Sequence, residues 1–455
     1  MSIEVFSPEL DYDTRVLNAS TSIYRTIVPQ ASSTPSLSQN SSVGPVEFVI
    51  PASVFNPKKS RLNFTLSAPS AGATPTFSWV NANALTMINR IVMYDVSTNA
   101  VWLDCSQFNS YSSLISTSGT CQSEFFSKGG SGSATPIAGN PVEDIMKSNS
   151  LNNYTVNMAG TVLDIGASNA YMGRRQKFIS ADNTAFTYDF SIPFSAFKHT
   201  ALAMDKQIYN PSNMILQVYF NGTDSYAFTS VSATAVTTVT SIPVGASLSN
   251  LSISLCNEGN LEVVGQVIET VMKSGISIPI GYPTTTRQSI ASSTSQAYQI
   301  QLTRGYGQRI LAIISAPFST ATGGGSGIAT ANIHGRGNIT FYNTFINNVA
   351  LKFPNGYDCT KSADYYIGNK EQLVGSALQN LAEYINCEWL HSDSFVGDKP
   401  LCHLDTSIIS GLDVSNQSST WQIQATLSGN TAYTWITAII GQKVLTLSNS
   451  GSVVV

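Results

Sequence analysis

The feature of this sequence that most limits its fold is strict alternation of apolar and polar residues. In the clearest stretches, 61–66, 186–192, 298–302 and 421–427, every second residue is aromatic or aliphatic. A period of two places the two sets of side chains on opposite faces of an extended chain, so these stretches are predicted to be half-buried β-strands. Further strands are predicted at 46–50, 87–94, 214–220, 309–315, 338–342 and 433–447. The chain is therefore predicted to be all-β, with only a few helices.

The clearest helical pattern runs from an N-cap at Asn260 to a C-terminal Gly275. Its apolar residues recur at spacings of three and four and are Val264, Val267, Ile268, Val271 and Met272. Shorter helices are predicted after Asn140, over 106–116 and over 377–389. Sparse helices between runs of strands favour β-sandwiches over repeated βαβ units.

Four stretches rich in Gly, Pro, Ser, Thr or Ala separate the predicted elements, and we interpret them as loops or tethers: 29–45, 129–133, 226–249 and 323–327. The third of them, followed by the helix, is the best candidate for a domain boundary. The predicted organisation is an extended N-terminal arm over 1–44, a first domain over 45–258, a connecting helix over 259–275 and a second domain over 276–455. Each domain then has a size suited to one elaborated sandwich.

Charge is scarce, which excludes several classes of function. Of 455 residues, 11% are charged, against about 25% in an average globular chain. The net charge of −4 gives no general field for holding phosphate backbones or anionic lipid, so direct nucleic-acid binding is not expected. The acidic first 13 residues do not resemble a secretory signal, and no apolar stretch is long enough to span a bilayer. We expect a folded, soluble chain that is made in a cytosol and does not insert into a membrane.

Groups able to do chemistry are few. The densest cluster holds Cys387, His391, Asp393, Cys402, His403 and Asp405. Cys387 and His391 would share one helix face, but the spacing of the remaining ligands is irregular for zinc. The glycine-rich pieces at 304–309 and 334–338 lack the Gly-Lys-Ser/Thr ending of a phosphate loop. We therefore predict no metal site, no cofactor and no catalytic residue. The six cysteines do not have the spacing of a disulfide framework or a zinc ribbon and are expected to be buried free thiols: Cys105, Cys121, Cys256, Cys359, Cys387 and Cys402.

The order of several segments resembles a known family. In the first half these are Met87–Asp95, Val101–Asp104, the stripe Phe108/Tyr111/Leu114/Ile115, Phe186–His199 and Asn213–Phe220. In the second half they are Ile276–Ile280, Gln299–Arg309, Ile310–Phe318 and Asn338–Asn347. Together they resemble a double jelly-roll major capsid protein of the adenovirus and tectivirus-like lineage, closest to those of polinton-like viruses and virophages.

The resemblance implies two eight-stranded jelly rolls standing side by side and a homotrimer that forms a pseudo-hexameric capsomer. Such capsomers tile an icosahedral shell around double-stranded DNA, so the implied partners are other copies, neighbouring capsomers, and penton and minor or cement capsid proteins. The implied location is the virion. Two alternatives stay open on the residues alone. One is a β-sandwich attachment or carbohydrate-binding protein, and the other is a jelly-roll hydrolase, for which the sequence shows no clustered acidic groove.

Overall fold

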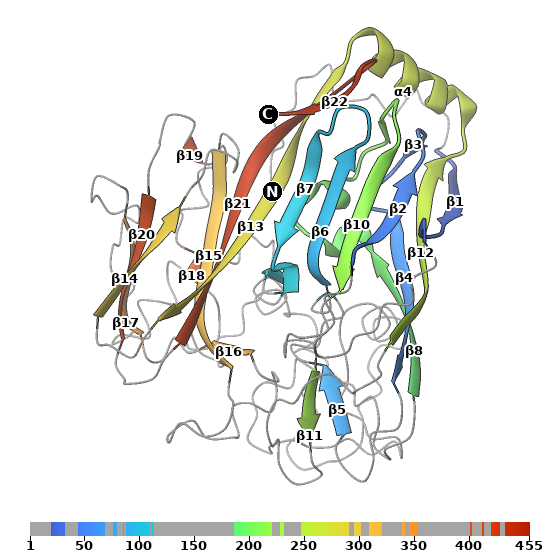
Figure 1. The fold of residues 1–455 in the computed structure, drawn as a ribbon. Coiled ribbons are helices and arrows are strands. Elements are labelled where there is room, and N and C mark those ends of the chain that lie inside the picture. Colours follow the sequence, from blue (N-terminus) through green and yellow to red (C-terminus); the bar gives the residue numbers. More distant parts are fainter. Residues whose placement is uncertain are drawn as a thin grey trace, which may run out of the picture.

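The computed structural model describes residues 20–31, 44–68, 76–79, 85, 88–109, 111–112, 186–220, 228–231, 247–290, 295–301, 309–320, 339–341, 346–352, 401–402, 412–413, 420–427 and 433–455. This part of the chain consists of antiparallel sheets with one long helix (Figure 1). The all-β prediction is confirmed. The helices expected after Asn140 and over 377–389 lie outside the described residues.

The first half contains two sheets that face each other. The β4 sheet has the strand order β8–β4–β12–β3–β9, with β1 paired to β12, and the β6 sheet has the order β2–β10–β6–β7. Their strands are β1 (Ser22–Ile27), β2 (Val46–Ile50), β3 (Val54–Phe55), β4 (Arg61–Ala68), β6 (Ile88–Asp95), β7 (Val101–Ser106), β8 (Phe186–Pro193), β9 (Ile208–Tyr209), β10 (Met214–Phe220) and β12 (Ser247–Glu258). A separate ribbon pairs β5 (Thr76–Trp79) with β11 (Phe228–Val231). Two short 3-10 helices, η4 (Phe194–Ala196) and η5 (Ala201–Ala203), follow β8.

Alternating burial explains why these sheets form a sandwich. In β10 every second residue, from Met214 to Phe220, is buried, as a strand with one face on a core requires. Phe64 of β4 stacks on Phe190 at a ring-centroid distance of 5.1 Å and meets Phe220 of β10 edge-on at 5.7 Å. Because β4 and β10 belong to different sheets, the last contact joins the two sheets through the core.

The second half follows α4 (Leu261–Lys273). One sheet has the order β13–β21–β15–β16, with β22 on β21 and two short strands on β15, and a three-stranded sheet has the order β14–β20–β17. Their strands are β13 (Ile276–Ile290), β14 (Ser295–Gln301), β15 (Arg309–Thr320), β16 (Ile339–Phe341), β17 (Ile346–Lys352), β18 (Leu401–Cys402), β19 (Leu412–Asp413), β20 (Thr420–Leu427), β21 (Tyr433–Ser448) and β22 (Gly451–Val454). Strands β13 and β21 pair along 15 residues and form the longest ladder in this sheet.

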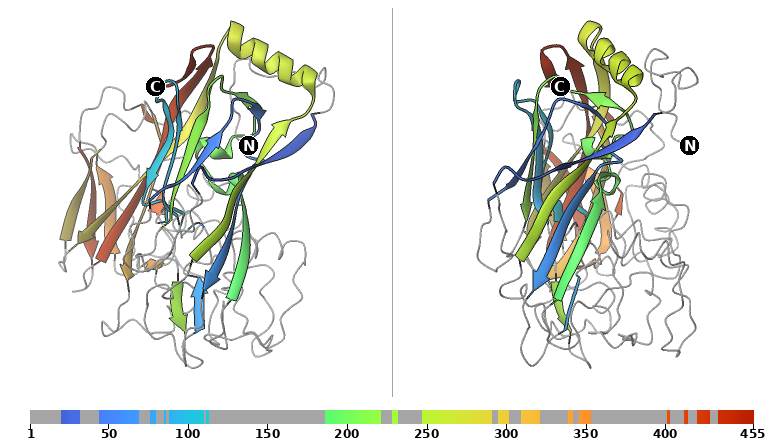
Figure 2. Two further views of the ribbon diagram at one scale, coloured as in Figure 1. Left: turned by 45° about the vertical axis from the view of Figure 1, so that its right-hand side comes forward. Right: turned by 90° about the vertical axis from the view of Figure 1, so that its right-hand side faces the viewer.

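The predicted connecting helix is present, and Val267 and Val271 of its predicted apolar stripe are buried, but Val263 is buried where Val264 was expected. The Asn260 side chain accepts a hydrogen bond from the Glu262 amide at 3.0 Å and caps the helix. Gly275 ends it at a φ of +70°, a conformation that favours glycine. The buried residues are Val263, Val267 and Val271. Val263 and Val267 pack with Val54 of β3, with Tyr209, Val264 and Ile268 beside them, whereas Met272 is exposed. The helix lies across the ends of the strands of the first half (Figure 2).

Part of the segment expected to be an arm forms a strand. The start of β1 is fixed because Ser20 Oγ and the Thr21 amide donate to the Glu258 carboxylate at 2.5 and 2.8 Å. From there β1 pairs with β12 in the register Ser22↔Glu258 to Ile27↔Ile253, while five of its six residues stay exposed. The alternation pattern does not predict β1, because five of its six residues are exposed and form no apolar face, and it does not predict β22, which has only four residues.

Candidate functional site at the seam between the two halves

The two halves meet along a seam where β7 of the β6 sheet lies beside β13 (Figure 1). The strands β7 and β13 form no backbone ladder with each other in the described part of the chain. Pro279 and Pro283 lie four residues apart in β13 and have no N–H, which suits an edge strand that pairs only with β21. The seam is therefore held by side chains and close packing, and we define it as the contacts of β6, β7 and residues 194–203 with β13, β21 and β22.

In one close approach across the seam, Gly281 of β13 packs against the backbone of His199. A Cβ atom placed on Gly281 would lie 2.3 Å from the His199 carbonyl oxygen and 2.7 Å from its carbonyl carbon. The segment that carries His199 is fixed from the other side, because the Tyr111 hydroxyl donates to the Lys198 carbonyl at 2.8 Å. Tyr111 and Phe108, both expected on the helical stripe over 106–116, are buried here, and Phe108 stacks on Phe197 at 5.5 Å. Only glycine permits this approach.

His199 is buried in the seam and has a φ of +59°. Burial lowers the pKa of its imidazole to about 4, and the charge of neighbouring Lys198 adds to this effect. Burial also lowers the pKa of Lys198. The imidazole is thus neutral at physiological pH, and protonating it would place a second positive charge in a closely packed region.

A pH dependence follows from His199. Its pKa is about 4 in the folded protein and about 6.5 in an unfolded chain, so the unfolded state binds the extra proton between these values. The free energy of unfolding is therefore expected to fall by about 3 kcal/mol as the pH drops from 7 to 4. Urea unfolding of the wild type and of His199→Asn, at pH 7, 5.5 and 4, measures this, because asparagine tolerates positive φ and does not titrate there. Equal pH slopes in both proteins would contradict it.

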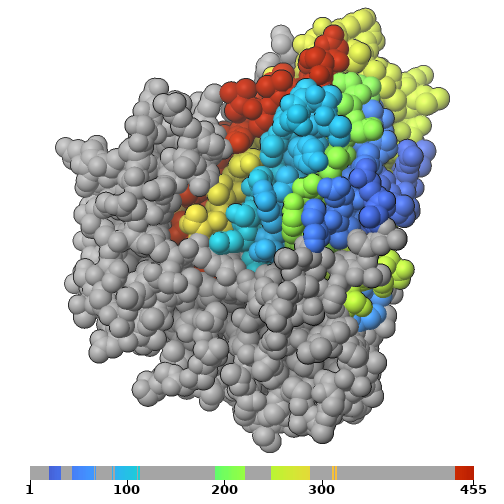
Figure 3. Space-filling model, in the orientation of Figure 1, coloured from blue at the N-terminus to red at the C-terminus, as the bar shows by residue number. Residues whose placement is uncertain are grey.

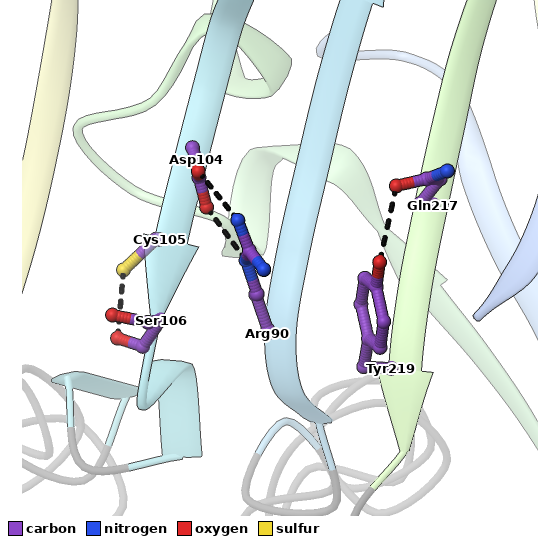
Figure 4. Close-up of polar contacts among 6 residues, drawn as sticks. All are labelled: Arg90, Asp104, Cys105, Ser106, Gln217 and Tyr219. Atoms are coloured by element: carbon purple, nitrogen blue, oxygen red, sulfur yellow. Dashed lines mark hydrogen bonds and ion pairs between the residues drawn. The ribbon is translucent and has the colours of Figure 1, made fainter. Parts of the chain in front are cut away.

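Beside the seam, the β6 sheet carries charged and aromatic side chains on neighbouring strands (Figure 4). Arg90 of β6 donates from Nε and Nη2 to the two carboxylate oxygens of Asp104 in β7, at 2.8 and 2.7 Å. Its guanidinium also lies 5.6 Å from the ring centre of Tyr219, and the bond to Asp104 raises the pKa of Arg90. Across the seam, Lys443 Nζ lies 3.8 Å from the ring centre of Tyr282. Partial exposure of the Arg90–Asp104 pair limits its contribution to about 1 kcal/mol.

At one end of the seam lies Asp95, the last residue of β6, whose side chain is fully buried. It accepts hydrogen bonds from the Ser97 amide and hydroxyl at 2.7 and 2.8 Å, from Asn210 Nδ2 at 2.9 Å and from the Ser212 hydroxyl. It also accepts from the amide and the hydroxyl of Ser452, both at 2.9 Å. Burial would raise the pKa of Asp95, but these hydrogen bonds outweigh it and hold that pKa well below its usual range.

Ser452 belongs to β22, so its hydrogen bonds to Asp95 connect the second half of the chain to the first. Its carbonyl accepts from Thr98 Oγ1 at 2.7 Å, and its hydroxyl accepts from the indole Nε1 of Trp102 at 2.8 Å. The space-filling view shows β21 and β22 lying directly against the hairpin of β6 and β7 (Figure 3). A buried, fully hydrogen-bonded carboxylate thus ties two parts of the chain that are 357 positions apart.

The described residues contain no group of three His, Cys, Asp or Glu side chains that could hold a metal ion. Of the cysteine and histidine cluster considered above, only Cys402 is described, in β18, so the prediction of no metal there stays untested. Cys105 and Cys256 are buried free thiols, as expected. Burial raises the pKa of Cys105 to about 12, which keeps that thiol protonated. No helix in the described part is long and apolar enough to cross a membrane.

The sequence alone does not predict the residues of the seam. Asp95 and Ser97 lie in the run Asp-Val-Ser-Thr, which is typical of a turn closed by an aspartate side chain, so they could have been noticed. Gly281 and Ser452 carry no local signal, because their partners are far away in the sequence. The arrangement aligns no nucleophile with a base. What it does is fix two sandwiches against each other.

Comparison with known proteins agrees with this architecture. No family model matches the sequence, and no curated protein matches it either. Among solved structures, the crystal structure of PBCV-1 VP54, fitted into a reconstruction of the virophage Sputnik, has 9% identity and a TM-score of 0.53 and covers 97% of this chain and 98% of that one. The PBCV-1 virus capsid model has 10% identity, a TM-score of 0.50 and the same coverage. The Faustovirus major capsid protein has 10% identity, a TM-score of 0.50, and coverage of 95% and 91%.

At these identities the likeness concerns the fold, and the fold is shared over nearly the whole length of each chain. The chain has the double jelly-roll fold of viral major capsid proteins. The narrower likeness to polinton-like viruses and virophages stays a prediction, because PBCV-1 and Faustovirus proteins match at the same level.

Proposed function

We propose that this chain is the major capsid protein of an icosahedral virus with a double-stranded DNA genome, and that three copies form a pseudo-hexameric capsomer. The observation that carries this proposal is the seam. Because Gly281, His199, Asp95 and Ser452 fix the two sandwiches of one chain against each other, each chain supplies two adjacent, rigidly related blocks. Three chains related by a threefold axis would then present six blocks, the outline needed to tile a surface.

Within this proposal, the first jelly roll is 45–258, the connecting helix is 259–275 and the second jelly roll is 276–455, preceded by the arm 1–44. The chain has a structural task, and no step of it requires an enzyme, a metal or a cofactor. Its proposed partners are other copies, neighbouring capsomers, and penton and minor or cement proteins. It would be made in the host cytoplasm and reside in the virion, without direct contact to nucleic acid or insertion into a membrane.

Self-association is the first test. Purified protein is expected to form particles of three times the 48.6 kDa chain mass at micromolar concentration, because a permanent interface of roughly 2,000–5,000 Å² per pair would hold the trimer. Mass photometry measures the mass, and negative-stain microscopy shows whether the particles have a hexagonal outline.

Compact monomers at that concentration would contradict the proposal. The attachment or carbohydrate-binding alternative would then gain support, and a glycan array would test it. Recovery of one copy per vertex in place of hundreds per particle would favour the same alternative.

A further inference from the structure

Strand β22 is held on both of its edges, and by different halves of the chain. On one edge it pairs with β21 in the register Ser448↔Gly451 to Leu445↔Val454. The pairing continues at Val444 and Val455, whose amides and carbonyls exchange hydrogen bonds of 2.9 and 3.0 Å. On the other edge it meets Asp95, Thr98 and Trp102 of the first half. We call the space that β22 occupies, between β21 on one side and Asp95, Thr98 and Trp102 on the other, the β22 slot.

The β22 slot satisfies every polar group of Ser452. The amide and hydroxyl of Ser452 donate to Asp95 Oδ2, and its carbonyl accepts from Thr98. The hydroxyl also accepts from the Trp102 indole. A single side chain must therefore donate to a carboxylate and accept from an N–H at the same point, which a hydroxyl does and a methyl group cannot. Since Trp102 is fully buried, a side chain without a hydroxyl leaves its indole N–H unsatisfied and removes one of the donors to buried Asp95.

The position before Ser452 accepts only glycine, because of its backbone conformation and its close neighbours. Gly451 has a φ of +110°, a backbone conformation that other residues rarely adopt. A Cβ atom there would lie 2.7 Å from Ser97 Oγ and 2.7 Å from Thr98 Cγ2. The β22 slot thus requires glycine followed by a hydroxyl residue, and then residues of high β-propensity, Val453 and Val454, that extend the ladder on β21.

The β22 slot would keep its form without the strand. Asp95 is also held by Ser97, Asn210 and Ser212, all from the first half, so its carboxylate stays in place when Ser452 is removed. The other wall is β21, which is fixed by its long pairing with β13 and β15. The binding groups are therefore arranged before the strand arrives.

We propose that the β22 slot is a peptide-recognition site, whose ligand is an extended segment with the chemistry Gly-Ser followed by β-branched residues. In the folded chain the ligand is β22 of the same chain. The side-chain recognition is complete enough that the same sequence, offered as a separate molecule, binds there by β-strand addition. The inference does not depend on the proposed capsid function, because it concerns one chain alone.

The test uses the full chain with a protease site inserted between Asn449 and Ser450, which are both exposed in the turn before β22. After folding, the protein is cut, and a fluorescent peptide of residues 449–455 is added in increasing excess, so that it displaces the severed strand by mass action, while its anisotropy is followed. We expect saturable binding of one peptide per chain. Ser452→Ala in the peptide removes the hydroxyl and is expected to weaken binding between about tenfold and a hundredfold. Gly451→Val is expected to abolish binding within the range of concentrations used.

Val453→Ala in the peptide is the matched control, because the Val453 side chain is about half exposed and should change binding only about threefold or less. Absence of binding, or equal binding of all four peptides, would overturn the proposal. Should the cut protein unfold, hydrogen exchange on the uncut Ser452→Ala variant decides: faster exchange of the β22 amides supports recognition through Ser452, and unchanged exchange overturns it.

Discussion

Replacing Gly281 by valine is expected to lower the free energy of unfolding by about 3 kcal/mol or more. The new Cβ would meet the carbonyl oxygen of His199 at 2.3 Å, and backbone atoms cannot rotate away as the end of a long side chain can. Relief requires that β13 move away from the segment that carries His199, which opens the seam. Urea unfolding measures the loss of stability, and limited proteolysis of the folded variant is expected to show faster cleavage near the seam.

Gly265 provides the matched control. It lies in the middle of α4, and a Cβ atom there would meet nothing within 4 Å. Alanine is a better helix former than glycine, so Gly265→Ala is expected to stabilise the protein by about 0.5–1 kcal/mol, whereas Gly281→Ala should destabilise it. If the two alanine variants changed stability in the same direction, the close approach of Gly281 to His199 would not be the cause.

The elements could be predicted from the sequence where the cause is local. The alternation in β10 and in β4 places apolar side chains on one face, and the structure buries that face. The cap at Asn260 and the stop at Gly275 bound α4 because they satisfy the helix ends within a few residues. The local pattern favours Val264, but Val263 is the residue buried. How the helix docks on Val54 decides between the two, and no local pattern reports it.

The seam could not be predicted because its causes are distant in the sequence. Gly281 looks like any glycine in a strand until the fold brings His199 against it. Asp95 reads as an ordinary turn residue, and Ser452 as one of many serines, until both lie at the same point. Low charge predicts what the protein does not bind, such as phosphate backbones. It carried no information about how two sandwiches are held together.

Asp95→Ala is expected to cost about 3–5 kcal/mol, the largest effect of any single side chain in the seam, because it leaves the amides of Ser97 and Ser452 without their acceptor and removes one acceptor of the Asn210 side chain. Hydrogen bonds hold the pKa of Asp95 below the value of about 3.9 that it has in an unfolded chain. Its contribution is therefore fully present above about pH 4 and is lost as the pH falls further. Urea unfolding of wild type and variant from pH 7 to pH 3 measures both the size and the pH range of the difference.

Asp205→Ala is the control for removing a carboxylate as such. Asp205 pairs with Lys58 at 2.9 Å, but both side chains are about half exposed, so its loss is expected to cost less than about 1 kcal/mol. A similar cost for both aspartates would show that the tie between Asp95 and Ser452 adds nothing beyond a surface ion pair. A cost confined to Asp95 that shrinks below pH 4 would show that one buried carboxylate, with donors from both halves, makes two sandwiches behave as one rigid block.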